Sequence, residues 1–378
     1  MHDSLLVAWI SLILAGGHKR KPIHALIKQS KSAEDIMAMS DLALKNAGFS
    51  DSTVDSMRNP PQDRIDSCLQ WLKQDNCQLI YLGHDLYPSL LTELVKPPLA
   101  LFVEGNAELL IQPQIAIVGS RNATPAGLKN TREFSAALAA NGFVITSGLA
   151  SGVDAAAHSG ALQKGSTIAV MGTGAGQIYP KMNRGLAEKI REQGLLVTEY
   201  PPGIKMNRGM FPARNRIISG LSLGVLVTEA SVRSGSLITA RCALEQTREV
   251  FALPGSIHNP LARGCHHLIR QGAFLVENVK EIIDQLAPVA GRMAEGLIRK
   301  LDFQAENLQN PAEDKNKLSV DNEYSRLLQA MTVDEPTTIN AIVHTSGLTA
   351  DEVSSMLLIM ELEGRVVMLP GGKYSKAS

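Results

Sequence analysis

Short apolar runs recur through the middle of the chain, and a more polar, helix-forming stretch separates each run from the next. The runs are rich in β-branched residues and mostly continuous, as in IAIVG at 115–119 and TIAVMG at 167–172. Continuous apolar strands are typical of a parallel sheet that is covered on both faces. Similar runs occupy 143–148, 195–200, 223–230 and 249–255. We therefore predict an α/β fold with a Rossmann-like, doubly wound, mostly parallel sheet.

The pattern changes on both sides of this region. Helical patterns at 4–14, 22–29, 33–46 and 61–74 predict a small helical domain over 1–75, ahead of the Rossmann-like domain at 76–290. Residues 291–320 lose the strand pattern and collect polar side chains, which indicates a linker. Residues 321–378 show three helical patterns, the last of them opened by Thr349 and Glu352 as a capping box, and then a hairpin at Pro370-Gly371-Gly372, which predicts a winged-helix domain.

Charge is distributed unevenly, although the 37 Lys and Arg of the whole chain balance its 37 Asp and Glu. Residues 112–285 hold 18 basic against 11 acidic side chains, whereas 1–111 hold 10 against 13 and 286–378 hold 9 against 13. A basic middle domain favours a polyanionic partner. Residues 321–378 hold only four basic against eight acidic side chains, so we expect the winged helix not to read duplex DNA.

The cysteines and the first apolar run indicate where in the cell the protein is expected. Four cysteines without a CxxC pair indicate reduced thiols, so we expect a cytoplasmic protein. The apolar run at 4–14 has no Lys or Arg before it and is shorter than the ~20 residues that span a bilayer. We expect a buried first helix and no membrane insertion. The turn at Gly16-Gly17 with the basic residues after it is similar to a helix-hairpin-helix turn that holds DNA phosphates, and equally to an ordinary turn between helices.

Small residues and arginines follow the predicted strands, as in VGSRNATPAG, SGLASGVDAAAH and EASVRSGSLITA. The carboxyl ends of parallel strands share one edge of a sheet, so these loops are expected to meet there. Glycine and serine let the backbone approach a phosphate and offer N–H donors. Positive charge comes from Arg121, Lys181, Arg208, Arg214, Arg216 and Arg233. The sequence predicts a phosphate-binding edge, although GTGAGQ taken alone lacks the last glycine of GxGxxG and fits a plain turn.

Two other groups of polar residues suggest chemistry more weakly. Asp154 and His158 are spaced one helical turn apart and could form an acid/base pair, but the same spacing is common in ordinary helices. His266 and His267 are adjacent, so their side chains diverge on a helix and do not suit one metal ion. We predict no catalytic residue, no metal site and no cofactor.

The motifs together resemble the bacterial DNA-processing protein A (DprA/Smf) family. The resemblance spans about 78–285 and rests on GSR at 119–121, SGLASGVDAAAH at 147–158, FPARNRIISGLS at 211–222, SGSLITARCALEQTREVFALPG at 234–255 and GCHHLIRQGA at 264–273. The chain departs from the family pattern at Ala175-Gly176, where a larger residue and an Asp are common, and at Ser151, where Arg is common.

The resemblance implies a protein of natural transformation rather than an enzyme. It would bind incoming single-stranded DNA, protect it and load the RecA recombinase onto it, acting as a homodimer through the Rossmann-like domain. The resemblance assigns the strand-binding site to Gly119, Ser120, Arg121, Lys181, Arg208, Phe211, Arg214, Asn215, Arg216, Ser234, Gly235 and Ser236.

The segment FPARNRIISG leaves two interpretations open. Arg214 and Arg216 are expected where the chain reaches a helix N-terminus, facing phosphates, with Phe211 stacking on a base. Alternatively, the arginines pair with acids such as Glu199 and Glu229, and Phe211 fills the core.

The rival function is a nucleotide or nucleoside-monophosphate hydrolase on a similar sheet. Such enzymes are expected to carry PGGxGT followed by Glu. The corresponding strand here ends in LPGSIHNP, and the chain's PGG at 370–372 lies in the terminal hairpin.

Overall fold

The computed structural model describes residues 2–16, 21–29 and 32–291, and in the C-terminal part 327, 330–331, 337–346, 353, 357, 360, 366–369 and 373–376. The chain forms two compact units, Met1–Ile298 and Arg299–Ser378. Apart from its first residue, the linker predicted at 291–320 lies outside the described residues.

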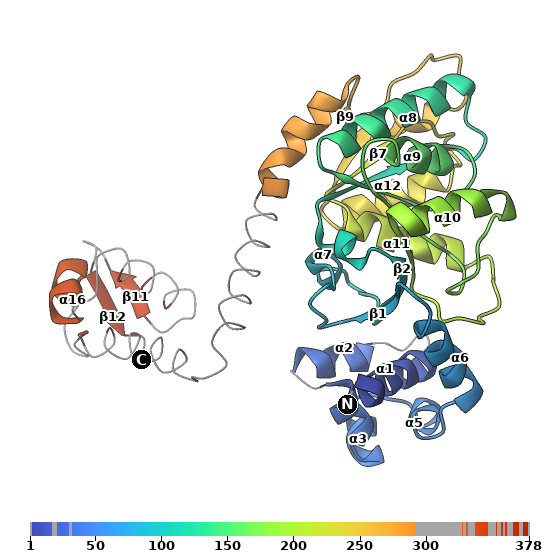
Figure 1. Ribbon diagram of the computed structural model, residues 1–378. Coiled ribbons are helices and arrows are strands. Elements are labelled where there is room, and N and C mark those ends of the chain that lie inside the picture. The colour runs from blue at the N-terminus through green and yellow to red at the C-terminus, as the bar shows by residue number, and fades with distance from the viewer. Residues whose placement is uncertain are drawn as a thin grey trace. The chain divides into compact units, whose positions relative to one another are not determined.

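A nine-stranded sheet forms the centre of the first unit, in the order β1-β2-β6-β5-β4-β3-β7-β8-β9 (Figure 1). Strands β3 to β9 are parallel to their neighbours, and β1 and β2 add an antiparallel extension beside β6. The strands are β1 (Cys77–Tyr81), β2 (Ala100–Gly105), β3 (Gln114–Val118), β4 (Val144–Ser147), β5 (Thr167–Val170), β6 (Leu195–Thr198), β7 (Gly224–Val227), β8 (Glu249–Ala252) and β9 (Phe274–Leu275). The predicted doubly wound, mostly parallel sheet is confirmed.

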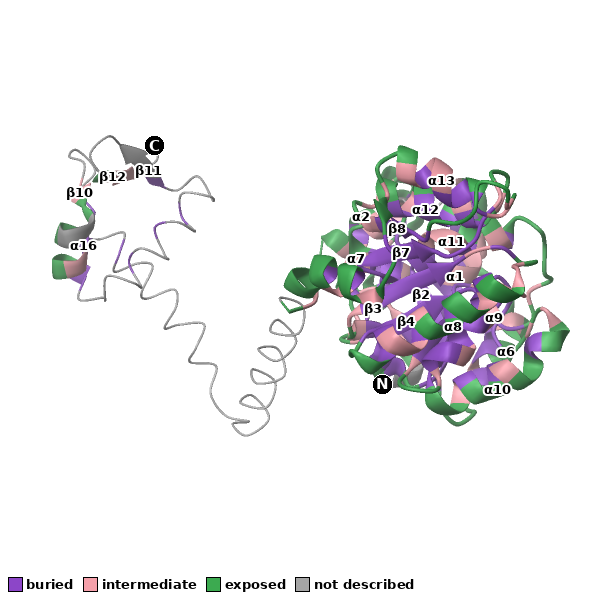
Figure 2. Cartoon of the chain, turned by 90° about the horizontal axis from the view of Figure 1, so that it is seen from above, coloured by how far each residue is buried: buried purple, intermediate pink, exposed green. Residues whose placement is uncertain are grey.

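Helices cover both faces of the sheet, and its strands are buried between them (Figure 2). Successive side chains of a strand point to opposite faces of the sheet, so a strand covered on both faces buries every residue. In β5, Ile168 and Val170 belong to one apolar core, and Ala169 belongs to the core of the opposite face. One face carries α8 (Pro125–Ala140), α9 (Val153–Ala161) and α10 (Arg184–Gln193). The other carries α7 (Ser89–Thr92), α11 (Met210–Leu221), α12 (Ser236–Glu245) and α13 (Arg263–Arg270).

The path of the chain creates a crevice in the middle of the sheet. From β3 the chain winds outward through β4 and β5 to β6, and α11 then brings it back to β7 on the other side of β3. The loops that leave β3 and β7 therefore diverge in opposite directions. In open α/β sheets such a switch point, beyond the carboxyl ends of the strands, is where ligands bind.

Six helices precede the sheet: α1 (His2–Gly16), α2 (Lys21–Lys28), α3 (Ala33–Ala38), α4 (Asp41–Asn46), α5 (Asp51–Arg58) and α6 (Gln62–Leu72). The single helical pattern expected at 33–46 is wrong, because Ser40 takes an extended conformation and its hydroxyl caps α4 at Ala43 N. Helix α5 was not expected.

The N-terminal helices share an apolar core with the first two strands. Trp9 stacks on Tyr81 with ring centroids 5.0 Å apart, and Trp71 meets Phe102 edge-on at 5.8 Å. The middle of the apolar run of α1, residues 8–12, is buried, and the apolar residues on either side of it are partly buried. No helix among the described residues has the length and apolarity to cross a membrane. The proposed boundary at residue 75 thus falls between elements that pack together within one compact unit.

The described residues of the second unit form a three-stranded antiparallel sheet in the order β10-β12-β11. Its elements are β10 (Thr337–Thr338), α16 (Ile339–Ser346), β11 (Val366–Leu369) and β12 (Lys373–Lys376). Val366 pairs with Lys376 and Leu369 with Lys373, which confirms the predicted terminal hairpin. Ile342 and Leu357 are fully buried in the small core of this unit. The capping box at Thr349 lies outside the described residues.

Candidate nucleic-acid interface

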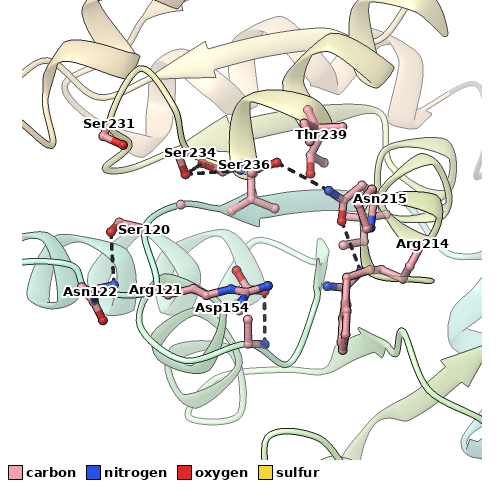
Figure 3. A pocket seen from close by; sticks show the side chains of 18 residues that line it. Ser120, Arg121, Asn122, Asp154, Arg214, Asn215, Ser231, Ser234, Ser236 and Thr239 are labelled. Atoms are coloured by element: carbon pink, nitrogen blue, oxygen red, sulfur yellow. Dashed lines mark hydrogen bonds between the residues drawn. The ribbon is translucent and has the colours of Figure 1, made fainter. Parts of the chain in front are cut away.

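A cavity of about 450 Å³ opens at the switch point between β3 and β7 (Figure 3). Its walls come from the β3 loop (residues 119–124), the β7 loop (residues 228–235) and the exposed start of α11. Nine of the twelve residues assigned by resemblance line it: Gly119, Ser120, Arg121, Phe211, Arg214, Asn215, Ser234, Gly235 and Ser236.

Glycines let the loops of the cavity approach one another closely. A Cβ at Gly119 would lie 2.6 Å from the Val153 side chain and 2.7 Å from the Glu229 carbonyl oxygen. Gly152 has a φ of +76°, and a Cβ there would lie 2.3 Å from the Ser120 carbonyl oxygen. The Ser120 N–H donates to the Glu229 carbonyl at 2.6 Å and joins the two loops. Gly119 is required for space, and Gly152 for both space and backbone conformation.

Serines and a helix N-terminus form the opposite wall. The hydroxyls of Ser234 and Ser236 lie 2.6 Å apart, and α12 begins at Ser236 with its first N–H groups at the cavity. The first N–H groups of α12 already bond within this turn: Ser236 N–H donates to Ser234 Oγ at 3.3 Å, Leu237 N–H to the Ser234 carbonyl at 3.1 Å and Ile238 N–H to the Gly235 carbonyl at 3.1 Å. What the wall offers a ligand is its serine hydroxyls and the partial positive charge of the helix N-terminus. The wall therefore suits an anionic group such as a phosphate.

Arg214 forms the floor of the cavity and is almost fully buried. Its Nη1 donates to the carbonyl oxygens of Gly148 and Val170, at the carboxyl ends of β4 and β5. Burial lowers the pKa of the guanidinium to about 10, an effect that the nearby Asp154 opposes. A group with this pKa is still protonated at neutral pH, so Arg214 both ties two strands together and supplies positive charge.

Asp154 is buried beside Arg214 at the start of α9 (Figure 3). Its carboxylate accepts from the Ala150 N–H at 3.2 Å. Burial raises the pKa of Asp154, and Arg214 opposes that shift. One turn further, His158 is fully buried, and its Nδ1 lies 2.7 Å from the Thr167 hydroxyl. Burial lowers the pKa of His158 to about 3, so it is neutral at physiological pH.

Arg121 differs from Arg214 because its side chain is exposed. Figure 3 shows it extending across the cavity above Asp154. No ion pair holds it within the parts of the chain that the structure describes. Its charge is therefore available to a ligand in the cavity.

Arg216 does not line the cavity. Its Nη2 lies 2.6 Å from each carboxylate oxygen of Glu199, so the pairing alternative holds for this arginine. Glu229 instead accepts from Thr124 and Asn259. Arg214 and Arg216 were expected at a helix N-terminus, but α11 begins at Met210, so both lie in its second turn. Pro212 misled that expectation, since proline is tolerated in the first turn of a helix.

Lys181 and Arg208 also lie outside the cavity lining, and both are exposed. Lys181 begins the short helix η2 (Lys181–Asn183), directly after the cis bond between Tyr179 and Pro180. Arg208 precedes α11. Among lining residues that were not assigned, Asn122, Ser231 and Thr239 belong to the same strand-end loops and the helix after them. Their position after strands was the signal that could have found them.

Phe211 is half-buried and separates the main cavity from a smaller one of about 80 Å³. Its ring centroid lies 5.6 Å from that of Tyr179, and both rings line the smaller cavity. The ring is neither core filler alone nor free in solvent. It presents an aromatic surface beside the positive charge of Arg121 and Arg214.

We expect Phe211→Ala to weaken binding of single-stranded DNA about ten- to a hundredfold, since stacking one base on an aromatic ring contributes ~1–3 kcal/mol. The measurement is fluorescence anisotropy with a labelled oligothymidylate, alongside thermal unfolding. Phe211→Leu is the control that keeps an apolar side chain. A large fall in melting temperature with unchanged affinity would instead show that Phe211 is mainly a core residue.

The fold and the cavity define a doubly wound α/β protein with an arginine-lined crevice at its switch point. Residues 78–287 match the DNA recombination-mediator protein A family, and residues 311–372 match the DprA winged helix domain. The chain belongs to the DNA recombination-mediator protein A family, and its resemblance to DprA/Smf proteins is confirmed.

Individual relatives agree with this assignment. Protein Smf of Escherichia coli is 40% identical over 370 residues, which cover 96% of this chain and 94% of that protein. DNA processing protein DprA of Streptococcus pneumoniae is 49% identical over 200 residues, 53% of this chain and 71% of that protein. Its X-ray structure aligns with a TM-score of 0.64 at 36% identity, covering 72% of this chain and 95% of that one.

A second solved structure bears on the ligand. DNA processing protein A from Helicobacter pylori, described with its single-stranded DNA binding mode, aligns with a TM-score of 0.51 at 33% identity. The alignment covers 56% of this chain and 96% of that one.

Proposed function

We propose that this chain is a DNA processing protein that binds single-stranded DNA in the crevice between β3 and β7. The observation that carries the proposal is the combination of an accessible and a buried arginine with an aromatic ring in one cavity, Arg121, Arg214 and Phe211. A basic groove next to a stacking surface is how proteins hold single strands without sequence preference. The single-stranded DNA binding of the Helicobacter pylori relative supports the proposal.

The cavity favours a single strand over a duplex for a geometric reason. Its walls are close-packed loops, and the Phe211 ring forms part of them. A base can reach that ring only when it is unpaired and turned out of a stack. The role proposed for Lys181 and Arg208 outside the cavity is to hold phosphates along the strand. Arg216 is paired with Glu199, so its proposed contribution to the site is positive charge near the strand.

The remaining parts of the function follow from membership of the family. We propose that the bound strand is incoming DNA of natural transformation, that binding protects it, and that it is passed to the RecA recombinase. The proposal includes a homodimer through the Rossmann-like domain, a cytoplasmic location and binding rather than catalysis. A separate helical domain over 1–75 and the domain limits at 290 and 320 are likewise proposals.

Salt dependence tests the binding proposal. If about six phosphates are neutralised, the logarithm of the affinity should fall against the logarithm of salt concentration with a slope of roughly −4, because each contact on a single strand contributes about −0.7. Titrations of the whole chain with an oligothymidylate at several salt concentrations measure the slope. The same oligonucleotide as a duplex should bind more weakly. A slope near zero, or release of free base from nucleoside monophosphates, would favour the rival hydrolase.

A further inference from the structure

The β5 loop (residues 171–180) runs from the end of β5 to Tyr179 and Pro180, which line the smaller cavity. The start of this loop touches Phe211: a Cβ at Gly172 would lie 2.8 Å from Phe211 Cδ1. The β5 loop therefore carries the Tyr179 ring at one end and contacts the Phe211 ring at the other. The contacts that fix the β5 loop therefore also fix the positions of these two rings in the site.

Part of the loop is tied to the end of β6. The Thr198 hydroxyl donates to the Thr173 carbonyl at 2.7 Å, and the Ala175 N–H donates to the Tyr200 carbonyl at 3.0 Å. Within the loop, the Thr173 hydroxyl donates to the Gln177 carbonyl. These bonds close the loop into a compact turn whose outer tip is Ala175-Gly176.

The tip packs against the N-terminal helices. Ala175 is buried and belongs to the same apolar core as Trp71 at the end of α6. Gly176 has a φ of +75°, and a Cβ there would lie 3.5 Å from Trp71 Nε1 and 3.6 Å from Cδ1, so the pyrrole ring of the indole faces the tip. Trp71 is nearly fully buried, and its Nε1 has no hydrogen-bond partner among the described residues.

The buried position of residue 175 suits a small side chain, and the positive φ at residue 176 suits glycine. A larger side chain at Ala175 would enter the core, and a side chain at Gly176 would be strained at its positive φ. These are also two of the positions at which the sequence departs from the family pattern. The two residues that differ from the family pattern, Ala175 and Gly176, are thus the ones that lie against the Trp71 indole.

We propose that Trp71 is a positioning residue for the strand-binding site, which it acts on by bracing the tip of the β5 loop and, through it, the wall formed by Tyr179 and Phe211. The inference rests on the proposed function. It gives the N-terminal helices a role in the affinity for single-stranded DNA without contact to the strand. Preorganising a loop raises affinity because less ordering is left for the ligand to impose.

Trp71→Phe tests the proposal, because phenylalanine keeps an apolar ring against Phe102 but lacks the pyrrole atoms that face Gly176. Trp9→Phe is the matched control, since Trp9 is equally buried in the same core and stacks on Tyr81 away from the loop. We expect Trp71→Phe to weaken oligothymidylate binding roughly three- to tenfold and Trp9→Phe to leave it within about twofold. Equal losses in both variants, or no loss in either, would overturn the proposal.

Hydrogen exchange and tryptophan emission separate a failure of the role of Trp71 from a failure of the proposed function. Hydrogen exchange of the free protein should be faster at the amides of residues 172–177 in Trp71→Phe than in Trp9→Phe, and this does not depend on DNA. In Trp9→Phe, Trp71 is the sole tryptophan, and its emission should change when oligothymidylate saturates the site. Unchanged exchange and emission would overturn the role of Trp71. Failure of the unaltered chain to bind oligothymidylate, with the exchange difference present, would overturn the proposed function instead.

Discussion

Replacing Arg214 with methionine is expected to lower the free energy of unfolding by about 3–5 kcal/mol, as well as to abolish strand binding. The guanidinium is buried and donates to the carbonyl oxygens of Gly148 and Val170. Methionine fills much of the volume but leaves both carbonyls and the Asp154 carboxylate without their cation. Urea unfolding at neutral pH measures the loss.

Arg121→Met is the matched control for this variant. Both arginines line the cavity, but Arg121 is exposed and forms no ion pair among the described residues. Its replacement should weaken binding to every DNA sequence alike while changing the free energy of unfolding by about 0.5 kcal/mol or less. If both variants lost equal stability, the clamp that we assign to Arg214 would be wrong.

Acidification is expected to destabilise the fold through His158. The folded state holds the pKa of His158 at about 3, below its ordinary value of 6.5, because the ring is buried and Arg214 repels its charged form. As pH falls below about 6.5 the unfolded chain takes up the proton first, so stability falls until the pH reaches the folded pKa. Between about pH 7 and pH 4 the loss from this group should be about 3 kcal/mol.

The difference between the unaltered chain and His158→Gln isolates that contribution. Asp154 shifts in the opposite sense, since its raised pKa lets the folded state bind a proton more readily, but it is present in both proteins. Unfolding free energies at several pH values should therefore fall less steeply for His158→Gln. Parallel pH profiles would show that folding does not lower the pKa of His158.

The sequence predicted the central sheet well because each parallel strand is buried on both faces. Continuous apolar runs mark such strands whatever their partners, and the loops after them reveal the binding edge. The antiparallel extension was not predicted in detail. Phe102 in β2 pairs with Thr198 in β6, and no local pattern encodes a pairing between residues so far apart in the chain. The same holds for β9, whose two residues are too few for a pattern.

Nine of the twelve assigned residues line one cavity, but the sequence did not reveal the different surroundings of the three arginines. Motif spacing brings Arg121, Arg214 and Arg216 to one region, yet only packing decides that the first is exposed, the second buried and the third paired with Glu199. The contact of Trp71 with Gly176 was beyond sequence reasoning for the same reason. It joins helices and sheet across about a hundred residues of chain.

The return of the chain from β6 to β7 has a consequence for the newly made protein. The β3 loop is complete by residue 124, but the wall that faces it, from Ser231 to Ser236, is made more than a hundred residues later. A chain that ends at β7 holds the residues of the β3 loop and of α11 but lacks the wall from Ser231 to Ser236. If the strand binds in this cavity as proposed, we expect a growing chain to become competent for binding only after Ser236 has been added, when seven of the nine strands of the sheet have already been synthesised.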